Sequence, residues 1–524
     1  MVTNTPDAPR RVPVLIVGGG PVGLTTALEL AHHGVASLIV EPRVDVEHSR
    51  PRAKTTSART MELYRRTGAA AEIRRRAAIP VEWSSEVRFC TTATGREITR
   101  LSGVLGLDLQ DSNLTAEAAQ QVTQPVVEEA LRALLQQRPE STLELGSRVI
   151  DVNLDGDLPF VRIENVDGVL STVTCDYLVG ADGSRSVVRA ALGAHYVGAA
   201  AGRPNVNITF RSEQLGALLP EGGAIHHWVL NPSFPGVLGP LSLDGLWWAI
   251  ATGTETIEDD DEAAALVRGL AGADIDVEVL ATDPWQARML LSDSYGSDRT
   301  YLVGDAAHQN PPWGGHGFNT GVGDAVNLAW KIAAVVQGWA PAELLDSYEA
   351  ERRPVAQQTI DLAGENMRAL SIDLTSPELI DDGPEGDQAR SAAALSIKQV
   401  KHAEFYSLGL VLGYGYGPDS SHQAPTSGEY YPVVAAGNRL PHSRSTGGES
   451  IFDSLGREFT VLGGDGRWAA AAARRGVPLV IGDPVDDRVV LVRPDQHIAW
   501  AGPASDDPDT VLDSALRGFG PPTS

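Results

Sequence analysis

Cysteine is scarce in this 524-residue sequence, which contains only Cys90 and Cys175. Two cysteines exclude a disulfide framework, a cysteine-rich zinc site and a Cys-x-x-Cys redox motif. We therefore predict no bound metal, and a reducing cytoplasm is the compartment that fits this composition.

Long apolar runs and an excess of basic residues are also absent. No segment approaches the roughly eighteen apolar residues of a membrane span, and residues 1–7 contain no apolar core of a signal peptide. The 42 basic residues are outnumbered by 68 acidic ones, which gives a formal net charge of -26 that would repel a polyphosphate. We expect a cytoplasmic chain that binds neither membranes nor nucleic acid.

What remains is the composition of an ordinary globular protein, with 42% apolar and 21% charged residues. The length exceeds the size at which one hydrophobic core keeps growing, so two or three domains are expected. The 54 glycines and 33 prolines predict many tight turns.

Apolar patterning predicts a mixed α/β chain. Residues 12–17 form an apolar run closed by glycines, residues 21–33 carry apolar side chains at helical spacing, and residues 36–40 form a second apolar run. Together they predict a βαβ unit. From residue 193 to 283 short strand patterns alternate with Gly, Pro and Asn, which indicates a mostly β insertion, and residues 321–337 predict a helix.

The last third of the chain contains a change of character. The acidic segment 371–387 is expected to be a surface connection followed by a helix, and the Gly/Pro/Ser-rich run 413–448 suggests a domain boundary. Strand patterns at 458–462, 489–492 and 498–500 predict a small closing α/β domain.

A glycine loop follows the first predicted strand. Gly18 permits the turn, Gly20 lets the backbone approach a pyrophosphate, Gly23 allows helix and strand to pack closely, and Glu41 ends the next strand where a ribose would lie. The same group of expected nucleotide contacts includes Pro21, Val22 and Arg43. Strand, loop, helix, strand and acid in this order predict dinucleotide binding, but they do not distinguish FAD from NAD.

Later motifs carry a family resemblance. Residues 182–189 (DGSRSVVR), 304–312 (GDAAHQNPP) and 314–319 (GGHGFN), with 324–331 and 348–354, resemble the fingerprints of the single-component flavoprotein aromatic hydroxylases of the para-hydroxybenzoate hydroxylase type. The resemblance covers nearly the whole chain. In the tail, the segments around residues 450–457 and 493–495 resemble the extra thioredoxin-like domain of the polyketide and phenol hydroxylase branch.

The resemblance implies an α/β fold: a Rossmann-type FAD-binding domain, an inserted mostly β substrate domain and a C-terminal thioredoxin-like α/β domain. We expect the FAD-binding domain at residues 1–83, 110–192 and 284–400, the substrate-binding domain at 84–109 and 193–283, and a linker helix with the thioredoxin-like domain at 401–524. The tail would serve packing or oligomer contact, so a homodimer is one expected assembly.

The resemblance also implies roles for individual residues towards non-covalent FAD. Asp305 resembles the aspartate that binds a ribityl hydroxyl, Arg52 the arginine at the pyrophosphate, and Gln124 a polar FAD contact. Asp182 and Arg189 match the fingerprint linked to both FAD and NAD(P)H. The remaining expected cofactor contacts are Gly183, Gly304, Gly317, Phe318 and Asn319.

The chemistry implied by the resemblance is hydroxylation of a phenolic or polycyclic, polyketide-like aromatic. NADPH or NADH would reduce the flavin, O2 would react with it, and the C4a-hydroperoxide would transfer oxygen to the ring. Pro311, Pro312, Gly314 and Gly315 match the loop beside the flavin ring and are the catalytic candidates, while no base is identified. A helix N-terminus near this loop would stabilise negative charge on reduced flavin.

Three side chains of the β insertion are candidates for the substrate pocket: His226, Trp228 and Trp248. Core packing is the alternative role for each of them. His308 and His316 receive no assignment.

Alternative functions remain open at this point. The same scaffold supports Baeyer-Villiger or epoxidising chemistry, and a flavin-binding protein without turnover is the candidate from another class. Tailoring of a polyketide-like phenol competes with catabolism of a simple phenol. The choice between NADPH and NADH, the regiochemistry and the oligomeric state also stay open.

Overall fold

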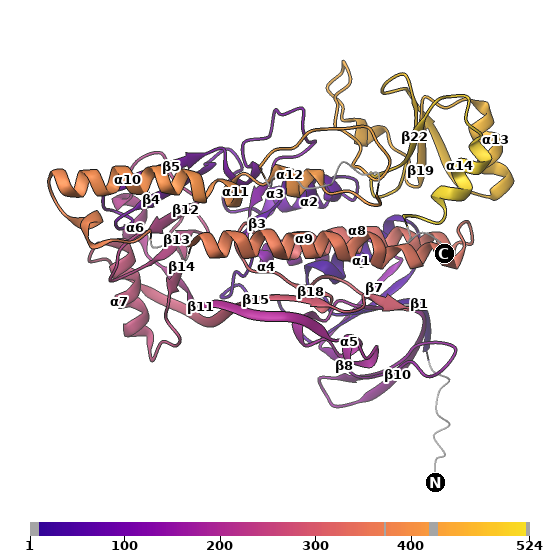
Figure 1. The fold of residues 1–524 in the computed structure, drawn as a ribbon. Coiled ribbons are helices and arrows are strands. Elements are labelled where there is room, and N and C mark those ends of the chain that lie inside the picture. Colours follow the sequence, from indigo (N-terminus) through magenta and orange to yellow (C-terminus); the bar gives the residue numbers. More distant parts are fainter. Residues whose placement is uncertain (1–9, 371–373, 419–427, 520–524) are drawn as a thin grey trace, which may run out of the picture.

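A computed structural model describes residues 10–370, 374–418 and 428–519 of the chain. Figure 1 shows strands β12 to β14 at one end of the molecule and strands β19 and β22 at the other, with the long helix α9 (Ser347–Leu370) running between them.

A parallel sheet forms the core of the N-terminal part. Its five parallel strands lie in the order β7-β2-β1-β10-β17. Their bounds are β1 Arg10–Val17, β2 Ser37–Glu41, β7 Ser141–Leu145, β10 Leu170–Gly180 and β17 Thr300–Leu302. Antiparallel additions are β8 Ser147–Asn153, β9 Phe160–Asn165 and β16 Gly296–Ser297. The predicted βαβ unit is confirmed.

Helices α1, α4 and α8 pack together beside this sheet. They span α1 Pro21–His32, α4 Gln124–Leu135 and α8 Gly317–Val336. The shorter helices and strands here are α2 Ala58–Arg65, α3 Ala69–Arg76, α5 Val187–Ala191, β3 Thr55–Thr56 and β6 Gln120–Gln121. Helix α8 starts four residues before the predicted residue 321, because glycines at its first turn weaken the helical pattern without preventing the helix.

The second sheet has the order β18-β15-β11-β14-β13-β12-β4-β5 and is antiparallel except where β12 meets β4. Its strands are β4 Glu86–Cys90, β5 Glu97–Ser102, β11 Tyr196–Arg211, β12 His226–Val229, β13 Gly236–Pro240, β14 Leu246–Thr252, β15 Glu278–Ser292 and β18 His308–Gln309. Helices α6 Glu213–Leu218 and α7 Asp260–Ala271 accompany it. The domain division stays a proposal, and its expected border at residue 283 lies inside β15.

The C-terminal sheet has the order β20-β19-β21-β22, with β19 and β20 parallel. Its elements are β19 Phe459–Leu462, α13 Gly466–Arg475, β20 Leu479–Gly482, β21 Val489–Val492, β22 Ile498–Gly502 and α14 Pro508–Ala515. This succession of a βαβ unit, a hairpin and a helix is thioredoxin-like. The three closing strands that the sequence predicts are all present.

One expected surface connection is partly helical. Helix α10 (Pro384–Val400) begins inside the segment 371–387, where Pro384 occupies the first turn, a position that needs no backbone N–H. A 3-10 turn, Pro377–Ile380, precedes it, and residues 371–373 lie outside the described part. Helices α11 (His402–Phe405) and α12 (Leu408–Gly413) follow; of the expected boundary at 413–448, residues 419–427 are not described.

The C-terminal domain is joined to the rest by apolar contacts and buried ion pairs. Trp330 of α8 lies in one apolar cluster with Phe459, their ring centroids 6.0 Å apart. Arg493 donates to both carboxylate oxygens of Glu351 at 2.9 and 2.7 Å. Arg439 likewise contacts both oxygens of Glu62. The last domain therefore packs on α8 and supplies countercharges to buried acids.

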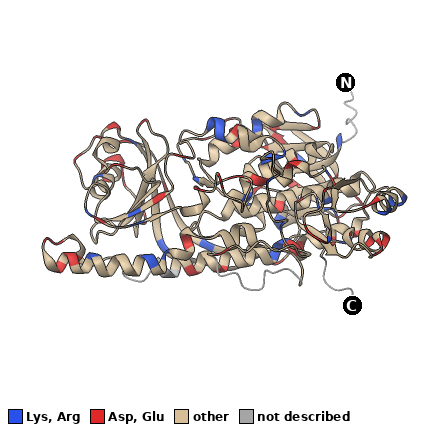
Figure 2. Ribbon diagram, turned by 90° about the horizontal axis from the view of Figure 1, so that it is seen from above, with Lys and Arg blue, Asp and Glu red and all other residues tan. Residues whose placement is uncertain are grey.

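Charges of both signs are mixed along the chain, and both cysteines are buried. Acidic and basic residues are interspersed along the ribbon (Figure 2). Cys90 and Cys175 are free and buried, and burial raises the pKa of each thiol to about 12. Among the described residues, no helix combines the length and apolarity needed to cross a bilayer.

Candidate active site

The glycine loop between β1 and α1 has the geometry of a phosphate-binding turn. Gly18 has φ +103°, and a Cβ there would lie 2.4 Å from the carbonyl oxygen of Ala181. A Cβ on Gly23 would lie 2.0 Å from the Gly18 oxygen, whereas one on Gly20 would meet no atom within 4 Å. No side chain caps α1, which begins at Pro21. The free N–H groups of its first turn are therefore available to an anion.

Glu41 lies directly beside this loop. Its Oε2 accepts a hydrogen bond from the Gly19 N–H at 2.7 Å, and its Oε1 accepts one from Arg43 Nε at 2.6 Å. Arg43 Nη2 lies 3.2 Å from a carboxylate oxygen of Glu128, which in turn accepts from the Gln124 side chain at 2.9 Å. The predicted residues Glu41, Arg43 and Gln124 are thus connected in one polar network. Glu128, which joins Arg43 to Gln124, was not predicted from the sequence.

The turn that carries Asp305 packs against both helix N-termini. It is a 3-10 turn, Gly304–Ala306, that follows β17. A Cβ on Gly304 would lie 3.0 Å from Val22 Cγ2, and a Cβ on Gly321 would lie 2.8 Å from Gly304 Cα. Only glycine allows α1, α8 and this turn to approach so closely. The Asp305 carboxylate remains accessible to solvent.

Arg189 and Tyr196 hold the backbone of this turn. Arg189 donates to the carbonyl oxygens of Ala306 and Ser184 at 3.0 and 2.9 Å. Its guanidinium carbon lies 3.8 Å from the Tyr196 ring centroid, and the Tyr196 hydroxyl donates to the Asp305 carbonyl oxygen. Arg189 is therefore placed to position Asp305.

Asp182 organises the start of α5. Its Oδ2 accepts from the N–H groups of Val187 and Val188 at 2.7 and 3.3 Å. Its Oδ1 is buried and has no partner among the described residues, and burial raises the pKa of this carboxyl group. Gly183 follows with φ +75°. A Cβ on Gly18 would lie 3.0 Å from Asp182 Cα, so this motif lies against the glycine loop.

Behind the Asp305 turn lies a buried ionic cluster centred on Asp324 of α8. Its Oδ2 accepts from His308 Nε2 at 2.8 Å and from the Gly304 N–H at 3.2 Å, while Oδ1 accepts from Arg352 Nε at 2.8 Å. Burial lowers the pKa of His308, but the Asp324 carboxylate outweighs it, and the net shift is upward. His308, which had no assignment, thus links α8 to the turn.

The loop before α8 is a tight glycine turn. Pro311 is buried and Pro312 is exposed, and the Pro312 carbonyl oxygen accepts from the Gly315 N–H at 3.1 Å. Gly314 and Gly315 have φ +84° and +68°, values that side-chain-bearing residues rarely adopt. Burial lowers the pKa of His316 to about 4, and its Nε2 has no partner among the described residues.

The N-terminus of α8 is uncapped and lies beside the segment before α2. A Cβ on Gly317, the first residue of α8, would meet no atom within 4 Å. Phe318 is buried in the core. Asn319 accepts from the Ser57 N–H at 2.9 Å and donates to the Thr55 carbonyl oxygen at 3.1 Å. Asn319 therefore joins the two loops, a role that the sequence did not predict.

Arg52 adopts a backbone conformation that is uncommon for a residue with a side chain, with φ +51°. Neighbouring backbone bonds hold the segment, since the Gln124 N–H donates to the Ala53 oxygen at 2.8 Å. The Arg52 side chain is exposed. Desolvation by the surrounding protein raises the pKa of Asp305 although the side chain still reaches solvent, and the positive charges of His308 and Arg52 oppose that rise.

The three predicted pocket residues share one face of the second sheet. Successive residues of β12 point to opposite faces of the sheet, so His226 and Trp228 share one face. Val229 lies on the other face, where it packs in the core under α7. The His226 ring centroid lies 5.1 Å from that of Trp248, and Phe405 of α11 lies 6.2 Å from Trp228. We call these four side chains, His226, Trp228, Trp248 and Phe405, the aromatic wall. Phe405 was not predicted.

Lys54 and Trp313 connect the second sheet to the segments that carry the predicted cofactor residues, and Lys54 does so at the aromatic wall. Lys54, two residues after Arg52, has its Nζ 4.3 Å from the Trp248 ring centroid. Trp313, next to Pro312, has its ring centroid 6.2 Å from that of Trp285 on β15. The two groups of predicted residues thus adjoin each other.

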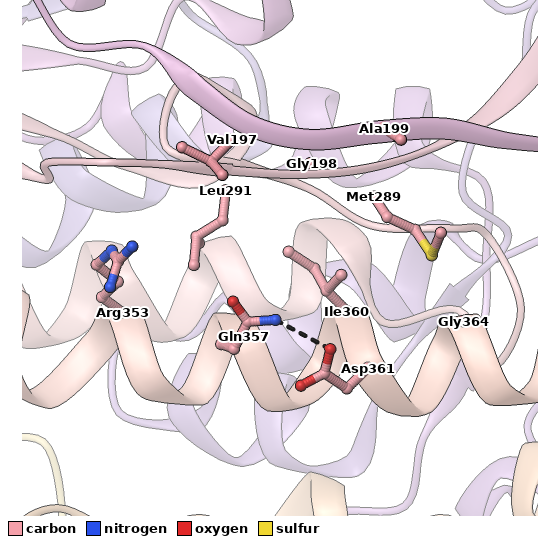
Figure 3. Close-up of a pocket in the computed structure, with 10 residues that line it drawn as sticks. All are labelled: Val197, Gly198, Ala199, Met289, Leu291, Arg353, Gln357, Ile360, Asp361 and Gly364. Atoms are coloured by element: carbon pink, nitrogen blue, oxygen red, sulfur yellow. Dashed lines mark hydrogen bonds between the residues drawn. The ribbon is translucent and has the colours of Figure 1, made fainter.

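Two cavities lie away from every predicted site residue. One, of about 320 Å³, separates α9 from β11 and β15 (Figure 3). Met289, Leu291 and Ile360 point into it, and Gln357 donates to Asp361 at 2.9 Å on its α9 side. The other, of about 370 Å³, lies between α2 and the C-terminal domain. Neither is lined by the glycine loop, the Asp305 turn or the aromatic wall.

Comparison with known families agrees with this geometry. A family described as "FAD binding domain" matches residues 11–363, and one described as "Aromatic-ring hydroxylase, C-terminal" matches residues 434–522. This chain belongs to the FAD-dependent aromatic-ring hydroxylases. It is a flavin-dependent monooxygenase, and the resemblance stated from the motifs is confirmed.

Relatives match over the full length. The chain is 34% identical to 4-methyl-5-nitrocatechol 5-monooxygenase of a Burkholderia species, over 97% of both chains. It is 30% identical to tetracenomycin B2 monooxygenase-dioxygenase of Streptomyces olivaceus, covering 96% of this chain and 98% of the relative. The solved structure of the rebeccamycin biosynthetic enzyme RebC with reduced flavin superimposes with a TM-score of 0.88 at 33% identity, covering 97% and 99%.

Proposed function

We propose that this hydroxylase inserts one oxygen atom from O2 into a phenolic ring, with NADPH or NADH as the reductant, by the oxygen-transfer route that the family resemblance implies. The observation that carries the proposal is the convergence of two uncapped helix N-termini and the Asp305 turn, next to an aromatic wall.

The residues present fit FAD. The space at Gly20 and Gly317, where a Cβ would meet nothing within 4 Å, leaves room for a ligand against both helix N-termini. Near the loop, Gln309 Nε2 and Asn310 Nδ2 are buried and lack partners among the described residues. These donors suit the carbonyl and ring nitrogen acceptors of an isoalloxazine.

The predicted residues around this space can be assigned to different parts of FAD. The first N–H groups of α1, with Arg52, would hold the pyrophosphate, Glu41 would accept a ribose hydroxyl, and Asp305 would accept a ribityl hydroxyl. The N-terminal turn of α8 would stabilise negative charge at the N1–C2=O edge of the flavin. FAD, when bound, would accept electrons from NAD(P)H and activate O2, from which one oxygen atom enters the ring.

The aromatic wall supports an aromatic substrate. Its rings offer stacking surfaces on the side of the sheet that Lys54 reaches from the Arg52 segment. The relatives include an enzyme named for a nitrocatechol and one named for tetracenomycin B2. We propose a phenolic substrate of one or more fused rings; a polyketide-like phenol is the first class to test.

The test is to purify the chain, record its visible spectrum and measure NADPH and NADH oxidation with a panel of phenols and fused-ring phenols. We expect a yellow protein that releases FAD on denaturation, and a substrate-stimulated rate. Mass spectrometry and NMR of the product then identify a ring hydroxyl. A lactone or an epoxide as the product would indicate Baeyer-Villiger or epoxidising chemistry in place of ring hydroxylation. A colourless protein would overturn the proposal.

A further inference from the structure

Lys54 is a cation with no carboxylate beside it in the part of the chain that the structure describes. Its Nζ donates a hydrogen bond to the Arg52 carbonyl oxygen at 3.1 Å and lies over the Trp248 ring. Among the described residues, no carboxylate oxygen lies within 4 Å of it. In a chain of net charge -26, an ammonium left unpaired in a partly buried position calls for an explanation.

The backbone around Lys54 is held on both sides. The Lys54 carbonyl oxygen accepts from the Val122 N–H at 2.8 Å, and the next residue, Thr55, pairs with Gln121 across a short two-stranded sheet. Asn319 adds its bond to Thr55 from the α8 side. The ammonium is therefore presented from a fixed segment between the proposed flavin site and the aromatic wall.

The groups around Lys54 can bind acceptor atoms of a ligand. Trp228 Nε1 and Trp248 Nε1 are buried donors without a partner among the described residues, and His226 Nδ1 is also unpartnered. His226, the titratable group of the wall, has its pKa lowered to about 3 by burial and by the Lys54 charge, so it is neutral. Burial lowers the pKa of Lys54 to about 8, which leaves most of it charged near neutral pH.

We propose that Lys54 is a specificity-determining residue that selects aromatic substrates carrying an anionic oxygen, a phenolate or a ring carboxylate, and directs that oxygen to the junction of the aromatic wall and the flavin loops. The inference rests on the proposed function. An unpaired cation and unpartnered indole donors match an anion better than a neutral ring. A relative named for a nitrocatechol, an acidic phenol, is compatible with this choice.

The test compares two probes of equal shape, 1-hydroxy-2-naphthoate and 1-hydroxy-2-naphthamide, by calorimetric titration of the purified holoenzyme. The variants are Lys54→Met, Lys54→Arg and, as a matched control, Lys398→Met on the exposed side of α10. We expect Lys54→Met to lose about 10-fold or more of the preference for the naphthoate, with amide binding nearly unchanged. Lys54→Arg should keep the preference, and Lys398→Met should equal wild type.

Equal preference in Lys54→Met and wild type would overturn the inference, and so would a wild-type protein that fails to prefer the naphthoate. These results are separable from failure of the proposed function. The bound-FAD spectrum and NADPH oxidation report on the function, whereas calorimetry reports on the anion preference without turnover.

Discussion

Replacing Arg493 by Met should destabilise the protein far more than replacing an exposed arginine. The guanidinium donates to Glu351 at 2.9 and 2.7 Å and to Asp495 at 2.7 and 3.1 Å, and the three side chains are at most 3% exposed. Lys331 gives Glu351 its second cation, at 2.9 Å. Two cations therefore balance two carboxylates, and the variant leaves one negative charge buried and uncompensated. That costs about 3–5 kcal/mol, a large part of the roughly 5–15 kcal/mol typical of a folded protein.

The assay is urea unfolding followed by circular dichroism and tryptophan emission. Arg474→Met is the matched control, because this arginine pairs with Asp509 while 58% exposed, and such a pair contributes at most about 1 kcal/mol. If the loss in free energy of unfolding of Arg493→Met is within about 1 kcal/mol of the loss of Arg474→Met, the reasoning is refuted.

The deficit should also depend on pH. The cations around Glu351 outweigh its burial and hold its pKa below the ordinary 4.5 in the wild type, so their stabilisation is present above that value and is lost as pH falls through the depressed pKa. In Arg493→Met the pKa of Glu351 rises, and protonation relieves the buried charge sooner. The difference between variant and wild type should shrink as pH falls towards 4.5. A difference that does not change with pH would contradict this account.

Three further outcomes are expected. Gly20→Ala should fold normally, because a Cβ there meets no atom within 4 Å, yet it should bind FAD about 10-fold more weakly or worse. Gly18→Ala should be unstable because Gly18 has a φ of +103°. Flavin titration and urea unfolding distinguish the two variants, and wild-type FAD affinity in Gly20→Ala would count against the phosphate site. Arg189→Met should raise the FAD dissociation constant about 10-fold by freeing the Asp305 turn, and an unchanged constant would exclude that positioning role. The pKa of His308 is raised in the folded protein, so its stabilising effect is complete below pH 6.5 and is lost as pH rises through the raised pKa. The difference in free energy of unfolding between wild type and His308→Gln should therefore decrease as pH rises, and a constant difference would refute this.

The elements with strong periodicity could be predicted from the sequence. The strand before Gly18, helix α1 and the closing strands of the tail carry continuous apolar patterns whose burial the fold requires. The motif residues were recognised through the family resemblance, and at Gly18 and Gly304 the structure gives the physical reason, a positive φ with close contacts that leave no room for a Cβ. Helix α10 was partly missed, because prolines and acidic residues near its start are as typical of a loop as of a first helical turn.

Contacts between distant segments could not be predicted. Glu128 joins Arg43 to Gln124, Asn319 reaches the segment before α2, and Phe405 completes the aromatic wall from a helix far along the chain. None of these pairings leaves a local pattern, because they depend on which loops meet at the carboxyl edge of the parallel sheet. Lys54 was missed because a lone lysine beside a recognised motif is usually a solvated charge.

Turnover in heavy-isotope O2 tests most directly whether this protein inserts oxygen from O2 into an aromatic ring. The purified holoenzyme, NADPH and the phenol that best stimulates NADPH oxidation are incubated under labelled oxygen, and the product is analysed by mass spectrometry and NMR. We expect one labelled oxygen atom in a new hydroxyl group on the aromatic ring. NADPH consumption that yields only peroxide, with every phenol recovered unlabelled, would contradict it.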